Sequence, residues 1–239
     1  MIGTPYAVLV AFKMKVDIKG AIGDFIERMY SREKSSSQST RALTACLDLL
    51  QENASGLHVG SGATKLHPFL VDVDLVYNPH LDCCARAESL PFCDGCFSLI
   101  VTHNTLEHVQ GLSSAIKEMY RVLRKGGKVY CQVPFVIGYH PGPSDFWRFT
   151  REGIREMFEQ AGFIHEETGV SVGPCVGFYF IAVEFGAVLA SRVMPSLYRP
   201  VKGVMAFLLY PIKLLDPLML EAAQVDRIPS AYFVVVRKP

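Results

Sequence analysis

Short apolar stretches alternate with amphipathic ones along most of this chain, and that alternation constrains the fold more than any other feature. We expect strands near 57–60, 69–74, 83–86, 98–102 and 128–134, and helices near 112–124 and 150–161. Strands and helices in this order imply right-handed crossovers, so the sequence predicts an α/β fold with a mainly parallel sheet and helices on both faces. Sheets of this kind bind ligands at the carboxyl ends of their strands, so functional residues are expected just after each strand.

The N-terminal part of the chain precedes this alternation. Apolar residues at helical spacing predict an amphipathic helix at 18–31, and the serine-rich run at 35–39 is typical of a flexible connector. A further helix is expected to begin near Thr40 and to lead into the first strand. We therefore expect an N-terminal helical segment with its linker at 1–39, followed by one main domain at 40–239.

A long apolar segment, 172–228, is inserted before the last expected strand at 231–237. Within its central part, 176–220, prolines and charged residues interrupt every window of about 20 residues, so a membrane-spanning helix is not expected. We favour burial of this segment against the protein itself, and a cover over the substrate pocket, a dimer surface and a membrane-interface contact remain alternatives. In a membrane interface, four basic side chains would meet anionic headgroups: Arg192, Arg199, Lys202 and Lys213.

Composition restricts the partners and the compartment. The 24 basic and 23 acidic residues give a net charge of +1, so there is no overall field that would attract nucleic acid, and no nucleic-acid partner is expected. The seven cysteines are scattered along the chain, which indicates reduced thiols in a cytoplasmic protein. Cys93 and Cys96 form half of a four-ligand zinc pattern without a second pair, so no metal site is expected.

The first two strand ends carry the pattern of a nucleoside site. Gly60 and Gly62, on either side of Ser61, allow a sharp turn and a close approach of ligand to the main chain. A dinucleotide fingerprint would place a third glycine at position 65, where this chain has Lys65, so a ligand without phosphates is favoured. Asp74, with Asp72 as the alternative, ends the second strand and is expected to accept hydrogen bonds from both hydroxyls of a ribose.

Several short motifs occur together in a fixed order. They are Val59-Gly60-Ser61-Gly62, Asp74, Ala87-Glu88-Ser89-Leu90-Pro91-Phe92, Leu106-Glu107-His108-Val109, Glu118-Met119-Tyr120-Arg121-Val122-Leu123 and Gly126-Gly127. In this order the chain resembles the class I S-adenosylmethionine-dependent methyltransferases of the broad type 11 group, over about residues 56–163 and the last strand. The resemblance implies a Rossmann-like, seven-stranded, mostly parallel sheet flanked by helices, with S-adenosylmethionine as cofactor across the glycine turn.

The resemblance also implies a role for particular residues. Asp74 would hold the ribose, the main chain at Ala87 would meet the adenine, and the main chain near His103 and Asn104 would face the methionine part. Arg86 stands where the family has an aspartate that accepts from the adenine amino group, and an arginine offers no acceptor.

The loop at 134–150 is expected beside the cofactor's methyl group, and it resembles a signature of a bacterial and plant subset of this family. His140 is the candidate general base, Asp145 a candidate orienting group, and Tyr139 a further residue on the acceptor side. The alternative is a structural loop in which Asp145 pairs with Arg148 and Trp147 caps the core. His108 is expected to be a packing or capping residue.

These features predict a methyltransferase that acts on an oxygen, nitrogen or carbon atom of a small-molecule or lipid-linked acceptor. The alternative from another class is a non-catalytic binding or interaction protein that kept the fold, since Arg86 and Thr64 replace residues of the family's cofactor site. A nucleotide-dependent oxidoreductase is a weaker third alternative. The sequence leaves the acceptor and the oligomeric state open.

Overall fold

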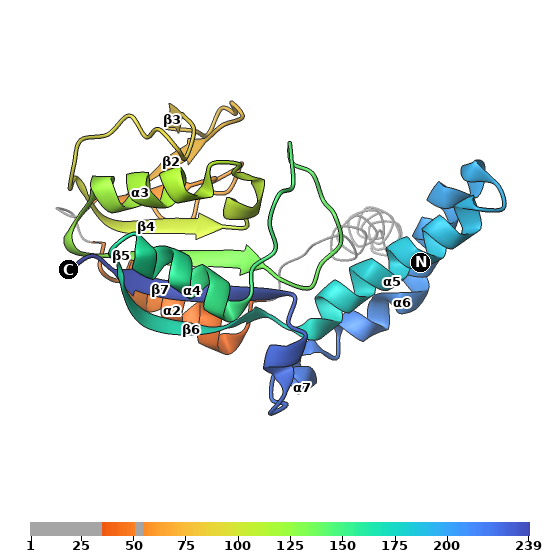
Figure 1. Ribbon diagram of the computed structural model, residues 1–239. Coiled ribbons are helices and arrows are strands. Elements are labelled where there is room, and N and C mark those ends of the chain that lie inside the picture. The colour runs from red at the N-terminus through yellow and green to blue at the C-terminus, as the bar shows by residue number, and fades with distance from the viewer. Residues whose placement is uncertain (1–34, 51–54) are drawn as a thin grey trace, which may run out of the picture.

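The computed structural model describes residues 35–50 and 55–239, so the helix expected at 18–31 lies outside the described residues. Seven strands form one sheet in the order β3-β2-β1-β4-β5-β7-β6 (Figure 1). The strands are β1 (Gly56–Val59), β2 (Leu70–Asp74), β3 (Cys83–Cys84), β4 (Phe97–His103), β5 (Leu123–Pro134), β6 (Ile164–Val172) and β7 (Ala231–Arg237). The longer helices are α2 (Ser37–Leu47), α3 (Leu112–Val122), α4 (Arg151–Gln160), α5 (Pro174–Ser191) and α6 (Tyr198–Lys213).

The expected mostly parallel α/β sheet is confirmed. Strands β1 to β5 pair with one another in parallel, because the connections between them return the chain to the same end of the sheet. The last strand, β7, lies antiparallel between β5 and β6. The carboxyl ends of β1, β2 and β4 therefore meet at one edge, where ligands of such sheets bind.

Alternating side chains along the strands build one core on each face of the sheet. Ile100, Val129 and Val234 pack with α3 and α4, whereas their neighbours Leu99 and Tyr130 pack with α2 on the other face. In Figure 1, α3 and α4 lie on the same face of the sheet. Both faces are covered, which explains why successive residues of the central strands β1 and β4 are buried on either side.

The serine-rich run is not the flexible connector that its composition predicts. Ser36 is the N-cap of α2: its hydroxyl accepts a hydrogen bond from Ser39 N at 3.0 Å, and its own N donates to Ser171 O at 2.6 Å. The Ser39 hydroxyl is buried and bonded to the Tyr130 hydroxyl at 2.7 Å. Small hydroxyl side chains let α2 approach the sheet closely while the buried hydroxyl groups of Ser36 and Ser39 stay hydrogen-bonded.

The apolar insertion forms a helical hairpin of α5 and α6 that projects away from the sheet (Figure 1). Only part of its apolar surface is buried: Tyr179, Val183 and Ala206 form a small core between the two helices. Outward-facing side chains are exposed, including Phe185 at 69% and Val193 at 84%. The preferred expectation, burial of the insertion against the rest of the protein, is therefore wrong for this outer surface.

Helix α5 also differs from the expectation that no segment is long and apolar enough to cross a membrane. Its 18 residues pass that test by length and composition, and they contain one charged side chain, Glu184. Core helices of soluble proteins pass the same test, and 39% of this helix is buried. A stretch of about 20 residues is longer than this 18-residue helix, so it includes charged residues or prolines from the neighbouring turns. For that reason the sequence pattern did not predict the helix.

Candidate active site

A cavity of about 270 Å³ opens at the carboxyl ends of β1, β2 and β4. The ends of β1, β2, β3 and β4, with the residues that follow them, and the loop after β5 supply its lining: Val59, Gly60, Val73, Asp74, Leu75, Val76, Ala85, Arg86, Ala87, Glu88, Asn104, Thr105, His108, Val109, Gly142 and Pro143. The volume lies near the lower end of the range for ligand pockets, about 300 Å³. Of the residues predicted to bind cofactor, the cavity brings together Gly60, Asp74, Ala87 and Asn104, while Ser61, Gly62 and His103 lie just outside its lining.

The glycine turn leaves the main chain accessible at its second glycine. Gly60 (φ +74°) and Gly62 (φ +53°) both adopt the left-handed conformation that favours glycine. A Cβ atom added at Gly60 would overlap the Thr105 side chain, which packs directly against the turn. A Cβ atom added at Gly62 would meet nothing within 4 Å, so the backbone here borders open space.

The two acidic residues of β2 have different surroundings. Asp74 lines the cavity, and its carboxylate accepts hydrogen bonds from Gly62 N and Val76 N, both at 2.9 Å. These bonds hold the carboxylate beside the glycine turn, and each oxygen keeps a second lone pair for a ligand. Asp72 shares the face of β2 with Asp74 but lies two residues before the strand end, where it is buried 3.1 Å from His58 Nδ1 and does not line the cavity.

Arg86, at the position expected on the adenine side, forms an ion pair with Glu88. Arg86 lines the cavity and donates to Glu88 Oε1 at 2.9 Å, while its side chain remains 60% exposed. Glu88 thus brings a carboxylate to the cavity two positions after the family's usual aspartate. The sequence motif contains Glu88, but only the turn between Arg86 and Ser89 brings its side chain into the cavity wall.

The residues after β4 contribute in different ways. Asn104 has a positive φ of +47° and lines the cavity, and its N donates to Gln132 O at 2.9 Å. The His103 ring turns away and packs against Tyr130, with ring centroids 5.3 Å apart. Burial lowers the pKa of His103 to about 4, so the ring is neutral near pH 7.

A second cavity, of about 490 Å³, lies between the loop after β5 and the helical hairpin. Its lining is aromatic and apolar with a few polar groups: Ile137, Gly138, Tyr139, His140, Tyr179, Phe180, Val183, Glu184, Tyr198 and Lys202. Two of the three predicted acceptor-side residues, Tyr139 and His140, line it, and Asp145 does not. The hairpin therefore shapes a cavity as well as presenting an outer apolar surface.

Asp145 holds the loop rather than the His140 ring. Its buried carboxylate pairs with Arg148 at 2.6 and 2.7 Å and accepts from the His140 backbone N at 2.9 Å, whereas His140 Nδ1 lies 3.6 Å away. The Asp145–Arg148 pair of the structural alternative is therefore present. Trp147 is 38% exposed and donates from Nε1 to Val109 O at 2.9 Å, so it ties the loop to the sheet edge instead of capping the core.

The chemistry of the first cavity fits S-adenosylmethionine better than a dinucleotide. Two carboxylates, Asp74 and Glu88, face a ligand there, and the cation present, Arg86, is paired with Glu88. Carboxylates accept from ribose hydroxyls and attract a sulfonium charge, but they repel phosphates. The open backbone at Gly62 supplies the close approach that a nucleoside requires.

Comparison with known proteins points in the same direction. Residues 38–131 match the type 11 family model described as a methyltransferase domain. The ubiquinone/menaquinone biosynthesis C-methyltransferase UbiE of Bartonella bacilliformis is 27% identical over 169 residues, which cover 62% of this chain and 59% of that protein. Matches to three Bartonella UbiE proteins span 59% to 62% of their length, about three-fifths of each relative.

Solved structures show the same fold at lower identity. The cyclase SpnF has a TM-score of 0.52 and 17% identity, with 87% of this chain and 85% of that chain covered. Phosphoethanolamine N-methyltransferase 2 of Haemonchus contortus, solved with S-adenosyl-L-methionine, has a TM-score of 0.50 and 16% identity, with 84% of this chain and 52% of that chain covered. Because one neighbour is a cyclase, the shared fold by itself does not determine the reaction.

Proposed function

Because this chain belongs to the class I S-adenosylmethionine-dependent methyltransferases of the type 11 group, we propose that it transfers a methyl group from S-adenosylmethionine to a small apolar or lipid-linked acceptor. The observation that carries the proposal is the cavity at the carboxyl ends of β1, β2 and β4, where the Asp74 carboxylate lies beside the open turn at Gly62. When bound, S-adenosylmethionine supplies a methyl group on a sulfonium that is already reactive.

The protein's part in such a reaction is to bind and align. Asp74 would accept from the ribose hydroxyls, and Glu88 would face the adenine side in place of the family's aspartate. Alignment of donor and acceptor contributes up to about 7–11 kcal/mol in favourable systems. His140 and Tyr139 line the second cavity, where we propose that they orient the acceptor and receive its proton if the acceptor atom carries one.

The acceptor class follows from the second cavity and from the hairpin. Aromatic and aliphatic side chains dominate the cavity lining, which suits a ring or an isoprenoid-like chain better than a charged metabolite. Several of the relatives are named as quinone-biosynthesis methyltransferases, which agrees with an acceptor that is lipid-linked. We propose a quinone-like or similarly apolar aromatic acceptor.

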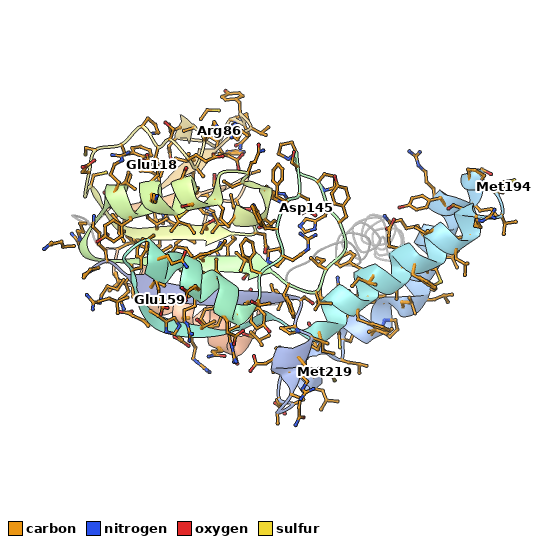
Figure 2. All side chains as sticks on the ribbon, in the orientation of Figure 1. Arg86, Glu118, Asp145, Glu159, Met194 and Met219 are labelled. Atoms are coloured by element: carbon orange, nitrogen blue, oxygen red, sulfur yellow. The ribbon has the colours of Figure 1, made fainter. Side chains whose placement is uncertain are left out.

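We also propose that the protein is cytoplasmic and contacts a membrane surface through the hairpin tip, from which a lipid-linked acceptor would enter. Figure 2 shows Met194 at the far end of the hairpin. Exposed Val193 and Met194 lie there with the exposed cations Arg192 and Arg199. Of the four cations expected to meet headgroups, Lys202 instead pairs with Glu184 at 2.7 Å and Lys213 is buried.

Calorimetric titration tests the donor site directly. We expect S-adenosylmethionine to bind and NAD to give no heat, with binding at least tenfold weaker in Asp74→Asn. Glu156→Gln, on the exposed face of α4, is the matched control and should bind as the wild type does. If neither ligand gives a heat of binding, the result would favour the non-catalytic interaction protein. If NAD alone gives one, it would favour an oxidoreductase.

A second experiment identifies the acceptor fraction. The protein is incubated with methyl-labelled S-adenosylmethionine and either a lipid extract or an aqueous metabolite extract. We expect label in the lipid extract, lost in His140→Ala and in a variant that fills the second cavity, Val183→Trp. Label only in the aqueous extract would contradict the lipid-linked acceptor while leaving methyl transfer intact.

A further inference from the structure

Three side chains converge between the two cavities. Glu107 and His108 belong to the short helix η1 (Leu106–His108), and His140 comes from the loop after β5. Nε2 of His140 lies 3.6 Å from Glu107 Oε1, and Nε2 of His108 lies 3.8 Å from the same oxygen. One ligand-type atom from each residue lies within 4.8 Å of the others.

Among the residues that the structure describes, none donates a hydrogen bond to the Glu107 carboxylate. The residue is 0% exposed, and both carboxylate oxygens are without a hydrogen-bond partner. Burial of a carboxylate costs several kcal/mol unless charge and hydrogen bonds compensate it. Arg148 is the neighbouring cation, but its guanidinium is already engaged by Asp145 at 2.6 and 2.7 Å.

Both histidines direct Nε2 toward this carboxylate. His108 Nδ1 lies 2.5 Å from Ser144 O, and His140 Nδ1 lies 2.9 Å from Gly138 O. A carbonyl oxygen can only accept, so each Nδ1 donates its proton there, and Nε2 is the ring nitrogen that each histidine directs toward Glu107. Arg148 Nη2 is 3.3 Å from His140 Nδ1, but it donates at shorter distance to Gly138 O, at 2.9 Å. Two ring nitrogens therefore lie 3.6 and 3.8 Å from one carboxylate oxygen without a direct hydrogen bond to it, which is the spacing of a set of metal ligands.

We propose that Glu107, His108 and His140 bind one divalent transition-metal ion. Metal–ligand bonds of about 2.0–2.2 Å allow one ion to contact atoms 3.6 and 3.8 Å apart, distances that are too long for direct hydrogen bonds. Each histidine already donates its other ring N–H to a backbone carbonyl, the arrangement that fixes metal-ligating imidazoles.

The donor set selects the kind of ion. Two imidazole nitrogens and one carboxylate oxygen suit Zn²⁺, Fe²⁺, Mn²⁺ or Co²⁺, whereas Mg²⁺ prefers oxygen ligands. Three protein ligands leave at least one coordination position open. His108 lines the first cavity and His140 the second, so the open position lies at the boundary between them. If the proposed function holds, an acceptor oxygen is the group that would occupy it.

The test is metal binding by the full chain after treatment with a chelator, which needs no activity. All measurements use a background protein that carries Cys93→Ser/Cys96→Ser, so that this pair of thiols does not bind the probe ion. We expect one equivalent of Co²⁺ to give a visible spectrum typical of nitrogen and oxygen ligands, and one equivalent of Zn²⁺ to displace it. Mg²⁺ should leave the spectrum unchanged.

Ligand variants and a control make the result specific. Affinity for Zn²⁺ should fall at least tenfold in Glu107→Gln and in His140→Gln, and stay unchanged in His165→Gln, whose ring bonds Thr168 on β6. Zinc should also raise the melting temperature of the background protein but not that of Glu107→Gln. A cooperative melting transition of Glu107→Gln without zinc checks that this variant is folded. Absence of stoichiometric binding, or equal affinity in Glu107→Gln, would overturn the proposal without affecting the proposed methyl transfer.

Discussion

Asp145 and Arg148 form a two-point ion pair, at 2.6 and 2.7 Å, in which the carboxylate is 1% exposed and the guanidinium 28% exposed. Figure 2 places Asp145 in the loop that stands beside the carboxyl ends of the strands. The same carboxylate holds the His140 backbone N. The pair therefore fixes the segment that carries the candidate acceptor-side residues.

The first prediction concerns the stability of this pair. Arg148→Ala should lower the free energy of unfolding by about 3 kcal/mol, because it leaves the Asp145 charge buried without its partner. Hydrogen bonds from Arg148 hold the pKa of Asp145 well below its usual range, so this stabilisation is complete above about pH 4 and is lost as the pH falls further. Denaturant titrations at pH 3 and pH 7 measure it. If Asp145→Ala/Arg148→Ala loses as much as the sum of the single variants, the two residues are not coupled.

The second prediction compares the two glycines of the turn. Gly60→Ala should cost well over 2 kcal/mol, since the new Cβ atom overlaps Thr105 in addition to the cost of a positive φ. Gly62→Ala should cost only about 1–2 kcal/mol, because its Cβ atom meets open space. Thermal melts of both variants measure the difference. Equal losses would mean that Thr105 does not pack against Gly60 as described.

The third prediction is that His103 lowers the stability of the folded protein at acid pH. Its pKa is about 4 in the folded protein, because burial and the nearby His58 disfavour the charged ring, against about 6.5 in an unfolded chain. The unfolded chain takes up the proton first, so stability should fall between about pH 6.5 and pH 4, by at most about 3 kcal/mol, and level off below. His103→Phe keeps the packing against Tyr130 and should flatten that slope, whereas His80→Phe, on an exposed loop, should not. An unchanged slope in His103→Phe would assign the effect to other groups.

The fourth prediction concerns the hairpin tip. Val193→Asp/Met194→Asp should lower the fraction bound to anionic lipid vesicles at least tenfold, because it removes two exposed apolar side chains and adds negative charge beside Arg192 and Arg199. Tyr77→Asp, 78% exposed on the loop after β2, is the matched control and should bind normally. Co-sedimentation with vesicles provides the measurement. Wild-type protein that stays in the supernatant would exclude the membrane contact.

Local patterns in the sequence determined the sheet, its glycine turn and the position of Asp74, because strand periodicity, turn glycines and strand-end acids are set by residues close together in the chain. Locality also explains the errors. Serine composition predicted a connector at 35–39, but Ser36 and Ser39 find buried partners on β6 and β5, about 90 to 135 residues away, and those partners stabilise a helix.

Only the tertiary structure decided which distant groups face one another. It brought His140 to Glu107, 33 positions apart by number, through a loop fixed by Asp145 and Arg148, and it set their distance at 3.6 Å. It also placed Arg86 against Glu88 in the cavity wall, and it left apolar side chains on the outer surface of the α5–α6 hairpin exposed. Sequence periodicity states which side chains share a face, but the loop conformation and the packing of elements decide what each face meets.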